Sequence, residues 1–177
     1  MRYFDLHPLR RLTRQCGFTI IELMVVVAIL AVLAALAAPS FQTLIERWRV
    51  RLAAEELEGT IYFARSEAIK RGGAVLIEAK SNSNDWQSGW SVTHTVGATK
   101  TVLQETPAQG QVNIGLAGGN GAIAVDRWGM AGHSGGAAGL LDFTITPKDK
   151  TTSDASAARL CAGVGGRVRR IKASESC

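Results

Sequence analysis

The sequence predicts an α+β fold, in which a long N-terminal helix packs on a C-terminal domain of antiparallel β-sheet and the first half of the helix spans a membrane. Three observations predict it: residues 18–38 are one apolar run, residues 39–71 continue with helical spacing, and residues 74–172 hold short apolar segments separated by Gly, Asn and Pro. The 177 residues suit one domain with an appendage. The predicted parts are a leader at 1–17, the helix at 18–71 and the β-rich domain at 72–177.

Composition excludes some classes of protein. Apolar residues make up 46% and charged residues 20% of the chain, which rules out wholesale disorder. The net charge is +5, and the leader holds +3 of it because four arginines oppose Asp5 there. The remaining residues therefore carry about +2, too little for a protein that coats nucleic acid but compatible with a local basic patch.

The apolar run is long enough to cross a bilayer. Its 21 residues make roughly 32 Å of helix. The basic leader before it and the polar domain after it favour a single-pass, N-in orientation, and the later Arg47, Arg49 and Arg51 weaken that preference without reversing it. Three interpretations compete: a secretory signal peptide cleaved after Ala35-Leu36-Ala37, a plain anchor, and a leader that is cut off while the apolar run is kept.

Glu22 favours the third interpretation. A carboxylate in a membrane helix costs about 2.5–3.5 kcal/mol at mid-membrane and less near an end, and an ordinary signal or anchor gains nothing from it. Cleavage after Gly17 would create an α-amino group on Phe18 that could neutralise such a carboxylate. Pro39 lacks an N–H group, so it is expected to bend or locally melt the helix.

The segment Gly17-Phe18-Thr19-Ile20-Ile21-Glu22 resembles the processing site of type IV pilins and type II secretion pseudopilins. The resemblance implies that a prepilin peptidase cuts between Gly17 and Phe18 and N-methylates Phe18. It also implies that Glu22 meets the N-terminal amine of a neighbouring subunit and that Pro39 belongs to the assembly helix. The partners are then other pilins, and the location is the inner membrane followed by a pilus or pseudopilus fibre in the periplasm or at the cell surface.

Beyond Pro39 the chain is predicted to be an amphipathic helix that ends at Arg71-Gly72-Gly73. The segment at 64–71, ARSEAIKR, resembles the FimT/GspH branch of the pilin family. The apolar stripe expected to pack on the domain comprises Phe41, Leu44, Ile45, Trp48, Leu52, Leu57, Ile61, Ala64 and Ala68.

The β-rich part is predicted from short apolar segments. A turn is expected at 81–85, and the nine glycines of residues 115–139 predict loops and tight turns around one strand. The expected strands are 74–79, 90–96, 101–105, 111–115, 122–126, 140–146, 159–162 and 167–172.

Catalysis finds no support in the sequence. The match of residues 119–124 to a dinucleotide-binding glycine motif is rejected, because no helix is expected after it and Asn120-Gly121 favours a turn. His7 lies in the leader, while His94 and His133 stand alone without metal-ligand spacing. The chain is therefore expected to be no enzyme and to use no cofactor and no metal.

Cysteine usage predicts one disulfide. Cys16 would leave with the leader, and Cys161 and Cys177 remain as an even pair in an oxidising compartment. Their bridge would stabilise the domain by about 3 kcal/mol and hold the C-terminus in place. Two free thiols are the alternative.

The segment inside this loop is strongly basic. Residues 163–166 can form the turn of a hairpin, after which Arg167 and Arg169 would share one strand face, with Arg170 and Lys172 on the other. Cations on both faces indicate an edge strand, where charge also prevents edge-to-edge aggregation. The functional alternative is capture of a polyanion, because the guanidinium fork fits phosphate oxygens.

The order Gly166-Arg167-Val168-Arg169 is similar to the GRxR motif of DNA-uptake members of the FimT group. The resemblance makes Gly166, Arg167 and Arg169 the motif positions, while Arg170 and Lys172 are added from charge alone and Arg159 is a weaker candidate. It implies a minor pilin of a type IV pilus that binds DNA nonspecifically for uptake in natural transformation. The alternative is a structural minor pilin or a GspH-like pseudopilin of type II secretion. No aromatic residue flanks the basic segment, so base stacking is not expected there.

Overall fold

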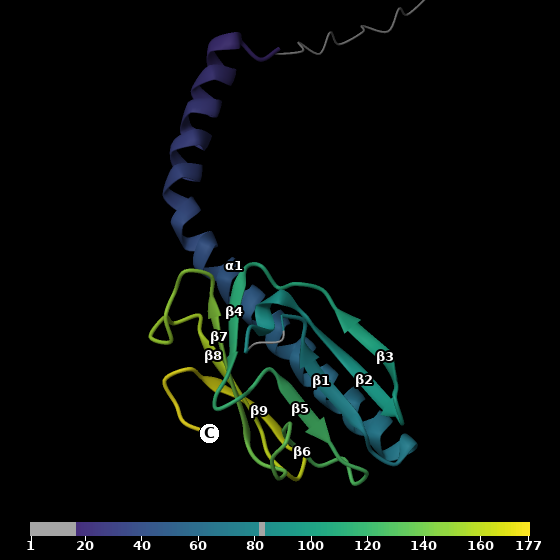
Figure 1. Ribbon diagram of the computed structural model, residues 1–177. Coiled ribbons are helices and arrows are strands. Elements are labelled where there is room, and N and C mark those ends of the chain that lie inside the picture. The colour runs from purple at the N-terminus through teal and green to yellow at the C-terminus, as the bar shows by residue number, and fades with distance from the viewer. Residues whose placement is uncertain (1–16, 82–83) are drawn as a thin grey trace, which may run out of the picture. The chain divides into compact units, whose positions relative to one another are not determined.

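The computed structural model describes residues 17–81 and 84–177 (Figure 1). Residues 1–16 of the predicted 1–17 leader, which include Cys16 and His7, lie outside the described residues, as do positions 82–83 of the predicted 81–85 turn. The chain divides into two compact units, Met1–Ser40 and Phe41–Cys177. Each unit is described by itself.

Helix α1 (Ile20–Arg71) begins in the first unit, two residues later than predicted. Thr19 is its N-cap: the Thr19 hydroxyl accepts a 3.3 Å hydrogen bond from the Glu22 N–H, and the Thr19 carbonyl accepts one of 3.2 Å from Leu23. Thr19 and Glu22 thus have the spacing of a capping box, which explains why the helix starts here. The helix continues through Pro39, so the expected local melting is not found.

The first unit contains a candidate membrane span. By length and composition, Ile20–Ala37 is able to cross a bilayer, with a mean hydropathy of 2.9. This agrees with the apolar run recognised in the sequence.

The second unit holds two antiparallel sheets. Their strand orders are β3-β2-β1-β5-β6 and β4-β7-β8-β9, and a short 3-10 helix, η1 (Trp86–Ser88), precedes β2. The strands are β1 (Val75–Ala79), β2 (Trp90–Val96), β3 (Thr99–Thr106), β4 (Val112–Leu116), β5 (Ala122–Val125), β6 (Ala131–His133), β7 (Leu141–Pro147), β8 (Ala158–Ala162) and β9 (Val168–Lys172).

The strands agree with the sequence prediction except for two short elements. All eight predicted strands are present, and their bounds differ from the prediction by at most two residues. The expectation of only loops after β5 is wrong, because β6 pairs there with β5 through Ile123 and His133. Strand β6 has three residues in a Gly-rich segment, which is too short to show the alternation that predicts a strand. Helix η1 was missed because it is equally short.

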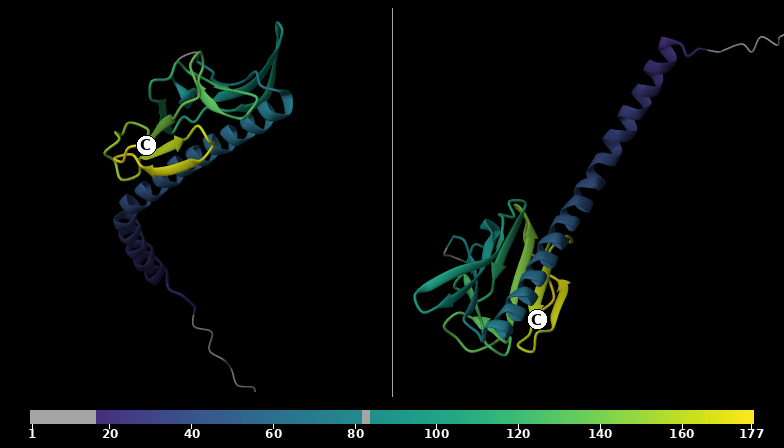
Figure 2. Two further views of the ribbon diagram at one scale, coloured as in Figure 1. Left: turned by 90° about the horizontal axis from the view of Figure 1, so that it is seen from below. Right: turned by 90° about the vertical axis from the view of Figure 1, so that its right-hand side faces the viewer.

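The core lies between the second half of α1 and the two sheets, which both lie on one side of that helix (Figure 2). The predicted helix stripe is partly wrong: its first five members are exposed, and three residues outside it are buried instead. At about 100° per residue these two sets occupy opposite faces of α1. The exposed set is Phe41, Leu44, Ile45, Trp48 and Leu52, and the buried set is Val50, Ala53, Ala54, Leu57, Ile61, Ala64 and Ala68.

One polar contact joins the helix to the first sheet inside this core. The Trp90 indole N–H donates a 3.0 Å hydrogen bond to the Thr60 hydroxyl, and both side chains are buried. Phe143 of the second sheet meets Trp86 edge to face at 5.2 Å between ring centroids. Trp86 of η1 also lies 6.4 Å from Trp90 of β2, so aromatic contacts connect the two sheets within one core.

Candidate nucleic-acid interface

The basic segment forms the β8–β9 hairpin at the edge of the second sheet. Its turn is closed by a 2.8 Å bond from the Gly166 N–H to the Gly163 carbonyl and a 2.9 Å bond from the Gly163 N–H to the Arg167 carbonyl. Gly166 has a φ of 86°, a conformation that L side chains rarely adopt. The predicted turn is therefore confirmed, and β9 is an edge strand because it pairs with β8 alone.

The register of β8 and β9 places the cations on two faces. Arg170 lies opposite Leu160, which is fully buried, and Lys172 lies opposite Ala158, so both belong to the face toward α1. Arg169 lies opposite Cys161 on the other face. Arg167 precedes β9 instead of belonging to it, so the expectation that Arg167 and Arg169 share a strand face is corrected to a turn residue followed by a strand residue.

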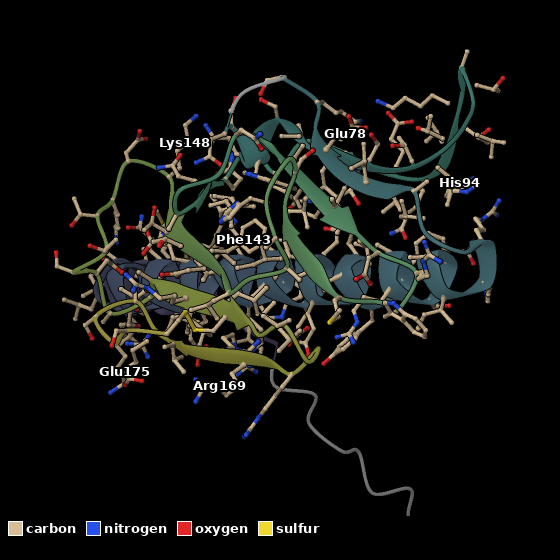
Figure 3. The ribbon with its side chains drawn as sticks, turned by 60° about the horizontal axis from the view of Figure 1, so that its bottom comes forward. Glu78, His94, Phe143, Lys148, Arg169 and Glu175 are labelled. Atoms are coloured by element: carbon tan, nitrogen blue, oxygen red, sulfur yellow. A yellow bond between two sulfur atoms is a disulfide. The ribbon has the colours of Figure 1, made fainter. Side chains whose placement is uncertain are left out.

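The disulfide between Cys161 and Cys177 is present, as predicted. It joins β8 to the last residue of the chain, 16 positions later, on the same side of the sheet as Arg169. The disulfide is thus attached close to the hairpin turn, because Cys161 and Arg169 form the pair next to the last β8–β9 pair, Ala162 and Val168. Figure 3 shows Arg169 at the margin of the domain along β9, while Phe143 lies in the interior and Lys148 on the far side.

The five cations considered in the sequence differ in their partners. Arg170 donates to Glu55 of α1 at 3.3 Å, and Arg159 makes a 3.4 Å ion pair with Asp142 of β7. Arg167, Arg169 and Lys172 are exposed, and within residues 17–81 and 84–177 they have no ion pair or hydrogen bond from the side chain. These last three are accordingly the charges available to a ligand.

Helix α1 adds two arginines that sequence reasoning missed. Arg47 and Arg51 line a groove of about 520 Å³ together with Arg170 and Lys172, and Glu175 is the acidic residue on its wall. The spacing of Arg47 and Arg51 places them on one helix face, yet nothing local in the sequence brings that face to β9. Only the packing of α1 on the second sheet creates this groove.

The carboxylate of Asp154, near the groove, is paired with a lysine of its own segment. Asp154, beside the same groove, accepts a 2.8 Å bond from the Ser156 N–H and pairs with Lys150 at 3.2 Å. The backbone N–H of Ser156, more than the ammonium of Lys150, holds the pKa of Asp154 below its usual range. Lys150 also binds Glu46 of α1, and these bonds raise its pKa, with the Glu46 carboxylate as the main cause.

A further arginine approaches the glycine of the hairpin turn. A Cβ atom placed on Gly166 would overlap the guanidinium group of Arg65 on α1. Arg65 is half-buried and makes no ion pair within the described part of the chain. The φ of Gly166 therefore requires glycine here, whereas the flexible end of the Arg65 side chain would have to move to admit a methyl group.

Nothing among the described residues suggests a metal centre. No group of three or more His, Cys, Asp or Glu side chains within residues 17–81 and 84–177 could hold a metal ion. His133 is isolated, with a buried Nδ1 that finds no hydrogen-bond partner there.

Comparison with known proteins places the chain in a family. Residues 53–175 match the model described as type II transport protein GspH, and residues 12–38 match the prokaryotic N-terminal methylation motif. A fimbrial protein of Pseudomonas aeruginosa is 34% identical over 96 residues, which are 54% of this chain and 62% of the relative. The chain thus spans about six-tenths of the length of this curated relative.

Two solved structures have a similar fold. The type IV minor pilin FimU of Pseudomonas aeruginosa matches with a TM-score of 0.58 at 20% identity, covering 74% of this chain and 94% of FimU. The minor pseudopilin EpsH of the type 2 secretion system of Vibrio cholerae matches with a TM-score of 0.53 at 14% identity, covering 73% and 99%. With its pilin-like fold, its methylation motif and a family match over more than half of its length, the chain belongs to the GspH family.

Proposed function

We propose that this chain is a minor pilin of the FimT/GspH-like branch. The first half of α1 anchors the precursor in the inner membrane with its N-terminus inside. A prepilin peptidase cuts between Gly17 and Phe18 and methylates Phe18, and the helix then enters a fibre of other pilins. The methylation motif at residues 12–38 and the apolar span Ile20–Ala37 support this proposal.

The exposed apolar face of α1 supports assembly with other pilins. Phe41, Leu44 and Trp48 are each 59–62% exposed, although they lie on a helix whose other face is buried in the core. Such a contiguous apolar face is typical of an interaction surface. In a fibre, neighbouring helices would cover it.

The second part of the proposal is nonspecific binding of DNA for uptake in natural transformation. One observation carries it: Arg167 and Arg169, from the hairpin turn and the edge strand, are exposed and unpaired within the described residues, and so is Lys172, which lines a groove with Arg47 and Arg51 of α1. Arginine forks fit phosphate oxygens, and an edge strand leaves room for a long polymer to pass. Contacts to about four phosphates correspond to a slope of log K against log salt near −3 to −4 on duplex.

The binding test uses the full chain in a non-ionic detergent and a dye-labelled duplex at low salt. The variant Arg167→Gln/Arg169→Gln is expected to bind at least about tenfold more weakly, because two phosphate contacts are lost. The matched control, Lys100→Gln/Lys148→Gln, removes two charges from β3 and from the end of β7, and should bind as the parent does. Equal binding by the parent and the arginine variant would refute the proposed DNA site.

A structural role in a pilus or in type II protein secretion is the second candidate. The 520 Å³ basic groove favours it as much as DNA binding, because acidic surfaces of partner pilins could occupy it equally well. A deletion strain separates the two. Loss of transformation with normal fibres supports DNA capture, whereas loss of fibres or of secretion supports the structural role.

N-terminal sequencing of the mature protein tests the processing step that both roles share. A mature chain that starts at Phe18 is expected. A start at Ala38 would instead indicate a secreted domain without the helix, as an ordinary signal peptide produces.

A further inference from the structure

The turn between β5 and β6 presents a tryptophan to solvent. Trp128 is 73% exposed, whereas the two tryptophans of the core, Trp86 and Trp90, are fully buried. Asp126 fixes the turn, since its Oδ1 accepts bonds of 2.9 Å from the Trp128 N–H and 2.8 Å from the Met130 N–H. The exposed ring is thus carried by a rigid backbone, which limits the entropy lost when a ligand binds it.

Arg65 connects this turn to the hairpin of the basic segment. A Cβ on Gly129 would lie 3.6 Å from the Arg65 Nε and 3.0 Å from the Ile69 Cδ1, while a Cβ on Gly166 would overlap the Arg65 guanidinium. The two turns therefore lie on either side of one side chain, although they are far apart in the sequence. Figure 1 shows both at the end of the domain where α1 ends.

Three segments that meet near Arg65 each carry a cation. Arg65 comes from α1, Arg127 precedes the tryptophan in the β5–β6 turn, and Arg167 follows the hairpin turn. The Asp126 Oδ1 accepts bonds from two backbone N–H groups, and the Glu67 carboxylate binds Lys70 and Arg71. An exposed aromatic ring and two exposed arginines, Arg127 and Arg167, therefore lie on the two turns that approach Arg65.

We propose that Trp128, Arg65 and Arg127 extend the β9 interface into a binding site for single-stranded DNA, in which an unpaired base stacks on the Trp128 ring. The inference rests on the proposed DNA binding of β9 and deepens it. Bases in a duplex already stack on one another inside the helix, whereas unpaired bases offer a free face to an aromatic ring. Phosphates of the same strand then reach Arg65, Arg167 and the cations of β9.

The test compares three dye-labelled probes with the detergent-solubilised full chain: a 12-nucleotide oligo(dT), a base-free strand of 12 deoxyribose phosphates, and a 12-base-pair duplex. The parent should bind oligo(dT) more tightly than the base-free strand. Trp128→Ala should weaken oligo(dT) binding by at least about fivefold and change binding of the other two probes by less than twofold. Trp128→Phe keeps an aromatic face and should retain most of the affinity for oligo(dT).

The outcomes separate this inference from the proposed function. Equal effects of Trp128→Ala on all three probes, or no effect on any, overturn the stacking site. If Arg167→Gln/Arg169→Gln still weakens every probe in that case, DNA binding by β9 stands alone. If the parent binds none of the probes, both proposals fall, and a protein contact becomes the explanation for the exposed Trp128. Circular dichroism of Trp128→Ala checks that the fold is kept.

Discussion

Arg170 on β9 donates a 3.3 Å hydrogen bond to Glu55 on α1, two residues that are 115 positions apart in the sequence. The bond joins β9 to α1 at Arg170, which lies between Arg169 and Lys172 in the sequence. Both side chains are partly exposed, at 35% and 53%, so the pair adds little to stability. Its main effect is electrostatic, because it places one negative charge among charges that are proposed to bind phosphate.

The variant Glu55→Gln should therefore bind DNA more tightly. Removal of this charge frees Arg170, and we expect a two- to fivefold gain at low salt, from about 0.5–1 kcal/mol of electrostatic free energy. The gain should disappear at high salt, where the interaction is screened. Glu105→Gln, which removes a carboxylate from β3, is the matched control. Unchanged affinity in Glu55→Gln would show that this carboxylate does not face the ligand.

Gly166→Ala should destabilise the domain and weaken DNA binding. A φ of 86° costs an L residue about 1–2 kcal/mol, and the new methyl group also meets Arg65. Thermal unfolding followed by circular dichroism measures the loss. Gly165→Ala is the control, since its Cβ enters open space at an ordinary φ. The double variant Arg65→Ala/Gly166→Ala should recover only part of the stability, because it removes the overlap and leaves the strained backbone.

Loss of the disulfide should lower the melting temperature substantially. The disulfide closes a loop between Cys161 and Cys177, which are 16 positions apart, and in the chain-entropy model this raises the free energy of unfolding by about 3 kcal/mol. For a domain of this size the double variant Cys161→Ala/Cys177→Ala should melt roughly 10 °C lower. Calorimetry in the absence of reductant measures the shift. A shift below a few degrees would mean that the C-terminal segment is held by its other contacts.

Stability should fall in acid partly through Glu67. Hydrogen bonds from Lys70 at 2.9 Å and Arg71 at 2.8 Å, the first being the larger cause, hold the pKa of Glu67 below its ordinary value. The unfolded chain therefore takes up a proton on Glu67 first as the pH falls. The stabilisation is complete above the ordinary glutamate pKa, about 4.3, and is lost as the pH drops through the lower folded value.

Urea unfolding of the parent and of Glu67→Gln across pH 3–7 tests this pH dependence. The free energy of unfolding of Glu67→Gln should fall less between pH 5 and pH 3 than that of the parent. Lys70→Gln should lie between the two, because Arg71 still binds the carboxylate. Identical slopes for the parent and for Glu67→Gln would contradict the assignment.

Glu22→Gln should block incorporation into fibres. The Thr19 hydroxyl accepts its bond from the backbone N–H of residue 22, and Gln is also accepted at this position of a capping box. The helix start is thus kept while the charge proposed to meet the amine of a neighbour is lost. Immunoblots of sheared fibres measure incorporation, and N-terminal sequencing shows whether the leader was removed. Fibres that contain cleaved Glu22→Gln at the parental level would refute the pairing.

Much of the fold followed from local patterns. Short apolar segments between Gly, Asn and Pro breaks predicted eight strands to within two residues, because such breaks interrupt strands. The stripe on α1 was predicted less well. Phe41 to Leu52 and Val50 to Ala68 are apolar sets on opposite helix faces, and periodicity shows that a face is apolar without showing what covers it.

The candidate site likewise contains residues that the sequence identified and residues that only the packing placed there. Charge and glycine spacing identified Arg167, Arg169 and the turn before them. The positions of Arg47 and Arg65 had no such signal, since both lie far from β9 in the sequence and reach the hairpin region only through the packing of α1.

The sequence by itself determined the membrane-length helix, the processing motif, the order of the predicted strands and the pairing of Cys161 with Cys177, because each depends on composition or on spacing along the chain. Tertiary structure alone decided which apolar face of α1 is buried, that Arg170 is held by Glu55, and that Arg65 lies against Gly166. The physical reason is that charge and packing act through space. Burying the Val50 face of α1 on the two sheets selects the helix residues that reach the edge strand.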